Sequence, residues 1–162
     1  MATKSANDIV NNFARNVIQG IQNNIRTKNV TQYGAMQSSG QMANSLNYKW
    51  DGRRLVIYSN EKYFTVLEDG RKPGKQPPRS VIEKWLDDKP VALREISKKS
   101  LAFLIARKIG KEGSLLYKQG GNSGVISDFI NDQYIKENLT DKLFLATVKE
   151  VTNILKDGKS RT

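Results

Sequence analysis

The chain contains no cysteine and no histidine among its 162 residues. Without cysteine it can form no disulfide, use no thiol nucleophile and build no cysteine–histidine zinc site. Without histidine it lacks the usual general base of Ser-His-Asp and Cys-His catalysis. These absences exclude several classes of enzyme, and the lack of cysteine agrees with a reducing compartment.

Long apolar runs are also missing from the sequence. No stretch approaches the roughly 18 residues that a transmembrane helix needs, and the first eight residues lack the apolar segment of a signal peptide. We therefore expect a soluble protein that is made in the cytoplasm and has no membrane partner. The length suits a single domain, residues 1–162, which is large enough to bury a core.

Acidic residues are few relative to basic ones, with 16 Asp and Glu against 27 Lys and Arg, a net charge of +11. The excess lies between residues 53 and 118, whereas residues 125–158 carry four basic and six acidic side chains. A chain with this balance attracts polyanionic or acidic partners. The charge therefore indicates binding rather than a particular fold.

Apolar periodicity predicts helices at both ends of the chain. In residues 7–28, apolar side chains recur at every fourth position, which is typical of an amphipathic helix. Residues 125–158 predict two further helices. The first spans 125–138, and the second begins after Thr140 as its N-cap and ends at Gly158.

Two more helices are expected in the middle of the chain, over residues 80–113. Ser80 is the expected N-cap of a short helix. A longer helix over residues 91–111 follows Pro90, and its predicted apolar stripe includes Phe103 and Leu104. Its remaining surface is basic.

The strongest local signal is Asp51-Gly52, which lies within a β-hairpin region expected over residues 45–68. Asp-Gly favours a two-residue type I′ turn, which would place Trp50 opposite Arg53. Alternation then gives the hairpin one half-buried face. The side chains expected on that face are Leu46, Tyr48, Trp50, Leu55 and Ile57.

Fold class follows from this hairpin and the helices around it. A lone hairpin is marginally stable, so helices must cover it. The expected fold is α+β: a small antiparallel β-sheet packed by amphipathic helices, with a helical C-terminal part.

The segments after the hairpin give weaker signals. Residues 62–68 fit either a strand or a short helix. Residues 69–79 hold three of the four prolines and predict an exposed basic loop, and residues 113–124 predict a second loop with an apolar centre.

No constellation of side chains predicts catalysis. Glu68-Asp69 and Asp87-Asp88 are adjacent carboxylates that point in different directions along a strand or helix. We interpret them as solvated surface groups rather than acid–base pairs or Mg²⁺ ligands. Residues 70–75 lack the spacing of a phosphate-binding loop. We expect no enzyme, no catalytic or metal-binding residue and no cofactor.

Several segments, taken in order, carry a resemblance over residues 7–113. After the first amphipathic helix, residues 39–46 read Ser-Gly-Gln-Met-Ala-Asn-Ser-Leu, and residues 63–70 read Tyr-Phe-Thr-Val-Leu-Glu-Asp-Gly. Residues 77–85 and 102–113 follow. Their order resembles the head–tail joining, or tail-completion, proteins of tailed bacteriophages, which have a Gly-x-Leu-x-x-Ser step into a hairpin and a Tyr-x-x-x-x-Glu-x-Gly turn. The chain departs from the family where Leu115-Leu116-Tyr117 replaces a Pro/Phe-rich stretch.

The resemblance implies a structural virion protein that forms a ring in the head–tail connector, or neck, joining the portal to the tail around the DNA channel. The implied partners are copies of the chain itself, in a twelve-fold rather than six-fold ring, the portal, other neck or tail proteins, and packaged DNA. The implied location is the virion neck, after synthesis in the host bacterial cytoplasm. The apolar helices exceed the needs of one small core, in agreement with assembly.

A ring closes through heterologous contacts, so each subunit must present two different surfaces. We expect these surfaces in the loops of residues 69–79 and 113–124. The side chains expected to make the contacts are Arg71, Lys72, Lys75, Arg79, Leu115, Leu116 and Tyr117.

The net charge leaves a second interpretation open, a free basic nucleic-acid-binding protein. The basic segment 98–111 and the loop 71–79 would neutralise phosphates, while Tyr58, Tyr63 and Tyr117 would stack on bases. No recognised nucleic-acid-binding module accompanies these residues.

Overall fold

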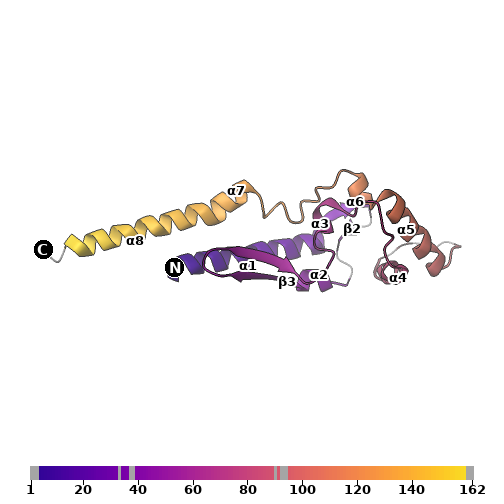
Figure 1. Cartoon of the computed structure of the whole chain (residues 1–162), viewed down its shortest axis with the longest axis horizontal. Helices are drawn as coiled ribbons and strands as arrows, with labels where there is room; N and C mark the ends of the chain where they lie inside the picture. The colour runs from indigo at the N-terminus through magenta and orange to yellow at the C-terminus, as the bar shows by residue number, and fades with distance from the viewer. Residues whose placement is uncertain (1–3, 33, 37–38, 90, 92–94, 160–162) are drawn as a thin grey trace.

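The computed structural model of the chain describes residues 4–32, 34–36, 39–89, 91 and 95–159. It is elongated, with α8 extending from one end and the pair α4–α5 at the other (Figure 1). The predicted α+β fold class is confirmed, with helices predominating. The elements are α1 Lys4–Thr27, β1 Asn29–Thr31, β2 Gly34–Ala35, α2 Gln41–Asn44, β3 Leu46–Trp50, β4 Leu55–Ser59, α3 Val66–Asp69, α4 Arg79–Asp88, α5 Lys98–Glu112, α6 Leu115–Lys118, α7 Asp132–Ile135, the π-helical turn Lys136–Thr140 and α8 Asp141–Lys159.

The main hydrophobic core forms along one face of α1, as the four-residue periodicity predicts. Val17 and Ile21 have no exposed surface, and the hairpin, α2 and the segment around Val125 cover them. Burying each such side chain contributes about 1.5–3 kcal/mol. The indole Nε1 of Trp50 donates to the Asn7 Oδ1 at 2.8 Å, which joins the end of β3 to the start of α1.

The hairpin of β3 and β4 has the predicted face but not the predicted register. Trp50 pairs with Leu55, not Arg53, so the loop contains four residues, 51–54, rather than two. The Asp51 carboxylate accepts the backbone N–H groups of Arg53 and Arg54 at 2.9 and 2.8 Å, and Gly52 has a positive φ of 88°. These hydrogen bonds favour the longer loop. Because the register shifts by two residues, the same side chains still point to the core.

The segments flanking the hairpin are more regular than expected. The polar connection before it contains the small pair β1–β2 and the single turn α2. The region after it, for which strand and helix were both open, ends in the short helix α3. The basic loop predicted over residues 69–79 is shorter by one residue at each end, because Asp69 ends α3 and Arg79 begins α4; residues 70–78 have no helix or strand.

A second, smaller hydrophobic cluster lies between α4 and α5, and it corrects three predictions. Helix α4 begins at Arg79, so Ser80 is not its N-cap. Helix α5 begins at Lys98, after an N-cap at Ser97 whose Oγ accepts the Ser100 N–H, and not at residue 91; Pro90 and Leu93 lie outside the described residues.

The third correction concerns the buried face of α5. Ala102 and Ala106 are fully buried against Ile82 and Leu86 of α4, whereas Phe103 and Leu104, predicted to be buried, are exposed. The small alanine side chains let the two helices approach closely. The positions of the large apolar side chains therefore predict the wrong buried face for α5.

The C-terminal part is also organised differently from the prediction. Residues 125–130 form turns rather than a helix. The helix begins at Asp132 and continues through the π-helical turn into α8, so Thr140 is not an N-cap and Gly158 lies within the helix. This long helix runs back beside α1 and continues past its N-terminal end (Figure 1).

Candidate assembly surfaces

The two segments in which the sequence predicts contacts lie together in the structure, although Leu115–Lys118 of the second form the helix α6 and not part of a loop as predicted. Gly74 donates its N–H to the Gly110 carbonyl, and Ser114 donates its N–H to the Arg71 carbonyl, both at 2.8 Å. In return, the Ser114 Oγ accepts the Arg71 N–H at 2.9 Å. These bonds fasten the basic loop to the end of α5 and the start of α6. The two loops therefore form one surface rather than the two that a ring contact requires.

Within this surface the predicted contact residues differ in accessibility. The basic side chains Lys72, Lys75 and Arg79 are exposed, and Tyr117 is exposed as well. Arg71 instead donates from its guanidinium to the Lys75 carbonyl at 2.8 Å and so shapes its own loop. Leu116 is only 6% exposed and belongs to the interior, and Leu115 is half-buried. Of the predicted contact residues, Lys72, Lys75, Arg79 and Tyr117 are therefore the ones accessible at the surface.

Arg79 also contacts an aromatic ring. Its guanidinium carbon lies 5.1 Å from the centre of the Phe103 ring, across the junction of α4 and α5. Such cation–π contacts at exposed sites are worth about 0.5–1 kcal/mol. This pairing accounts for an exposed phenylalanine that the sequence places in a core stripe.

Glu68, interpreted from sequence as a solvated group, is instead the centre of a hydrogen-bonded network. Its carboxylate accepts the N–H groups of Gly124 and Ile126 at 2.9 and 2.8 Å and the Ser127 hydroxyl at 2.6 Å. The Ser123 hydroxyl donates to the Leu67 carbonyl at 2.8 Å. We call these residues the Glu68 network. It attaches α3 to the turn that precedes α7.

The network determines the protonation of Glu68. Partial burial raises the pKa of this carboxyl, but the hydrogen bonds from Ser127, Ile126 and Gly124 outweigh it, so the pKa lies below its ordinary value. The charged form is therefore the one that the fold stabilises. The sequence did not predict this role of Glu68, because its hydrogen-bond partners lie more than 50 residues later in the chain. The Glu-x-Gly pattern of residues 68–70 was the only feature of the sequence that pointed to it.

Gly70, the glycine of that pattern, has its own structural role. Its φ is 75°, and a Cβ atom at this position would lie 2.5 Å from the Tyr117 backbone nitrogen. Only glycine fits this combination of positive φ and close approach. The Glu-x-Gly segment thus holds the turn of residues 123–127 through Glu68 and packs on α6 through Gly70.

A second attachment holds the same turn to α1. The Asn24 amide donates to the Gly124 carbonyl at 3.1 Å and to the Asp128 carboxylate at 3.0 Å. The Lys28 ammonium forms an ion pair with Asp128 at 2.7 Å. Further along, Phe129 lies over Gly20 and stacks edge-on against Tyr134, with ring centres 5.5 Å apart. Phe129 and, at the start of the C-terminal helix, Tyr134 therefore pack against the main core.

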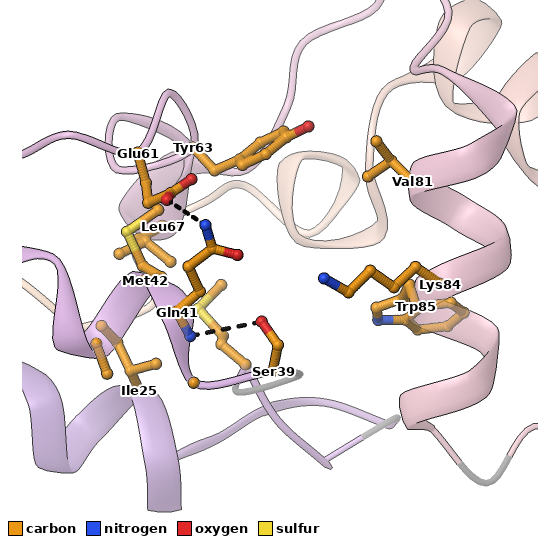
Figure 2. A pocket seen from close by; sticks show the side chains of 13 residues that line it. Ile25, Ser39, Gln41, Met42, Glu61, Tyr63, Leu67, Val81, Lys84 and Trp85 are labelled. Carbon is orange, nitrogen blue, oxygen red and sulfur yellow. Dashed lines mark hydrogen bonds between the residues drawn. The ribbon is translucent and has the colours of Figure 1, made fainter.

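A groove of about 380 Å³ separates the main core from α4. Its floor is apolar, with Ile25, Met42 and Leu67, and Figure 2 shows Val81, Lys84 and Trp85 facing these residues from α4. On the rim, the Gln41 amide donates to the Glu61 carboxylate at 2.8 Å. The groove therefore lies between the main core and the smaller hydrophobic cluster of α4 and α5.

The other surface is α8, whose outer part has no cover within the chain. Every residue from 147 to 157 is exposed. Phe144 is 67% exposed and Ile154 is 65% exposed, unusual values for large apolar side chains on an amphipathic helix. We define the α8 apolar face by its exposed apolar side chains: Phe144, Leu145, Val148, Val151, Ile154 and Leu155.

None of the described helices is long and apolar enough to span a membrane. No group of three or more acidic side chains in the described ranges is arranged to hold a metal ion.

Comparison of the chain with protein-family profiles, with curated proteins and with solved structures found no match.

Proposed function

We propose that this protein is a structural, non-enzymatic component of the virion of a tailed bacteriophage. In this proposal it forms a ring in the head–tail connector, or neck, and joins the portal to the tail around the DNA channel. Its partners are further copies of the chain, the portal and the adjoining neck or tail proteins.

The observation that carries the proposal is the exposed α8 apolar face. Its six side chains are each about half exposed or more, so the fold of one chain leaves them in water. Contiguous apolar surfaces of this size mark sites of association in soluble proteins. A role in assembly would explain why the apolar face of α8 is not buried in the core of its own chain.

The ordered motifs support the phage assignment. The Glu-x-Gly part of the resemblance coincides with Glu68 and Gly70, which hold the turn of residues 123–127 and approach α6. The residues that carry the resemblance therefore have specific structural roles in this chain. The exposed basic loop with Lys72 and Lys75 offers a further surface, apart from the outer part of α8 (Figure 1), for the portal or the adjoining neck or tail proteins.

Electron microscopy and mass photometry of the purified full-length chain test the proposal. We expect ring-shaped particles of uniform copy number, twelve if the ring follows the portal, and peptides of the chain in purified virions of the phage that encodes it. A protein that remains monomeric at tens of micromolar and is absent from virions would contradict the proposal.

The charge distribution favours one alternative, a free nucleic-acid-binding protein. Arg107, Lys108 and Lys111 are exposed on α5, close to the basic loop. If DNA is the main partner, binding must weaken steeply with salt, and the slope gives the number of phosphates contacted.

Filter binding between about 50 and 200 mM salt separates the two functions. A monomer that retains DNA at the lower salt, releases it steeply as the salt rises, and loses retention on Lys108→Glu and Lys111→Glu would favour the alternative. Rings that form without DNA and persist in both variants would favour the neck protein.

A further inference from the structure

The α8 apolar face has the spacing of a helix–helix contact. Phe144, Val148, Val151 and Leu155 follow intervals of four, three and four residues, the spacing of a coiled-coil seam. At 3.6 residues per turn, the whole face covers about half of the helix circumference. Polar side chains occupy the other half, with Asn153 near its centre and Lys149 beside it.

This outer helix has little to stabilise it within one chain. Residues 147–157 are all exposed in the fold of one chain. They include five β-branched side chains, which have lower helix propensity than straight-chain residues. Most helical stability in proteins comes from the packing of an amphipathic face, so an apolar partner would stabilise this end of the helix.

We propose that a second copy of this chain supplies the partner, and that α8 helices of neighbouring copies pack side by side through the α8 apolar face. Each copy carries the same seam, so two copies match in spacing and length. Six side chains about half to two-thirds exposed present on the order of 600 Å² of apolar surface, the upper end for a monomer's largest patch. Covering two such faces buries about 1,200 Å², which reaches the size of a specific interface.

The residues that flank the seam of the α8 apolar face indicate an assembly of more than two copies. A two-stranded coiled coil carries charged side chains beside its seam, which select the partner. Here Leu145 and Ile154 occupy those flanking positions. A face broader than a two-stranded seam lets each helix contact a neighbour on either side. The step from pair to closed ring rests on the proposed function, whereas the contact between α8 helices rests on the exposed face alone.

Two substitutions with the same product residue test the contact. Val151→Asp places a carboxylate in the α8 apolar face, and Asn153→Asp places one in the polar half, two residues away. Both positions are exposed and have similar helix propensity in the native chain. Molar mass is measured over a concentration series by light scattering, and far-UV circular dichroism reports whether the main core remains folded.

We expect the full-length chain and Asn153→Asp to assemble into particles of more than two chains. Val151→Asp should weaken self-association by on the order of a hundredfold or more, because the interface would bury an unpaired charge. A native dimer that Val151→Asp dissociates and Asn153→Asp does not would support the contact between α8 helices but not the larger assembly. A native protein that remains monomeric would overturn the proposal. So would rings that persist equally in both variants, a result that would leave the neck function intact.

The absence of cysteine provides a second measurement. Val151→Cys and Asn153→Cys each introduce one thiol into a cysteine-free chain, and a short bismaleimide reagent then joins neighbouring thiols. We expect covalent dimers from Val151→Cys and markedly fewer from Asn153→Cys. Equal yields from the two variants would contradict packing through the α8 apolar face.

Discussion

Helices α1 and α8 are the two longest in the chain, and both are amphipathic, but only one is buried. The apolar face of α1 forms the centre of the main core, where Ile21 has no exposed surface. The apolar face of α8 is in solvent, where Ile154 is 65% exposed. Similar sequence patterns therefore build the core in one helix and leave an apolar face exposed in the other, where we propose that it serves association. Periodicity tells which face of a helix is apolar, but not what covers it.

The largest expected effect comes from making the same substitution in both helices. Ile21→Ala should lower the free energy of unfolding by about 2–5 kcal/mol, since it leaves a cavity in the core. Ile154→Ala should change it by less than about 0.5 kcal/mol, because that side chain is exposed in one chain. Urea denaturation measures both.

Both substitutions are best made together with Val151→Asp, which removes self-association from the measurement. Equal losses of stability at the two positions would show that the outer part of α8 packs on its own chain. The comparison between the two helices would then fail.

The next largest effect is expected at Glu68, which holds the turn of residues 123–127 before the chain enters the C-terminal helix. Glu68→Ala removes the shared acceptor of the Glu68 network and leaves the N–H groups of Gly124 and Ile126 unpaired. We expect a loss of about 2–3 kcal/mol in the free energy of unfolding. Hydrogen exchange should show faster exchange in the turn of residues 123–127, and an unchanged rate there would contradict the assigned role.

The same network gives a dependence on pH. Because the folded-state pKa of Glu68 lies below its ordinary value, its contribution is fully present above the unfolded pKa, near 4.5. It is lost as the pH falls through the lower, folded-state value. Glu68→Gln should flatten the fall in stability below about pH 4.5 relative to the native chain.

The smallest effect concerns the contact between α1 and the segment leading to α7. A Cβ atom at Gly20 would overlap the ring of Phe129. Gly20→Ala should therefore cost about 1–2 kcal/mol, after the gain in helix propensity is subtracted from the steric cost. Thermal unfolding measures the loss.

A double variant provides the control. With Phe129→Leu the ring is absent, so Gly20→Ala should become neutral or stabilising. If Gly20→Ala is equally harmful in both backgrounds, the ring is not the obstacle.

Much of the fold could be predicted because its strongest signals are local. Helix α1 follows from its apolar periodicity, and the buried face of the hairpin from alternation. The hairpin register could not be predicted from Asp51-Gly52 alone, because Asp51 binds two backbone N–H groups of a longer loop. The buried face of α5 was predicted wrongly because small alanines, rather than Phe103 and Leu104, pack against α4.

The candidate assembly surfaces were less predictable because they depend on distant parts of the chain. The loops of residues 69–79 and 113–124 join through backbone hydrogen bonds, such as that from Ser114 to Arg71, which no side-chain pattern encodes. Glu68 depends on partners more than 50 residues away. An excess of apolar helices is visible in the sequence, but only the packing of the main core shows that α8 is the helix left outside.

The exposure of residues 147–157 also affects how freely this sequence can vary. A substitution at Ile21 is tested by selection through folding, before any partner is met. If α8 packs on a neighbouring copy as proposed, a substitution at Val151, which is 50% exposed in its own chain, is tested mainly through that contact. The outer part of α8 can therefore change to match an altered neighbour while the rest of the molecule keeps its sequence.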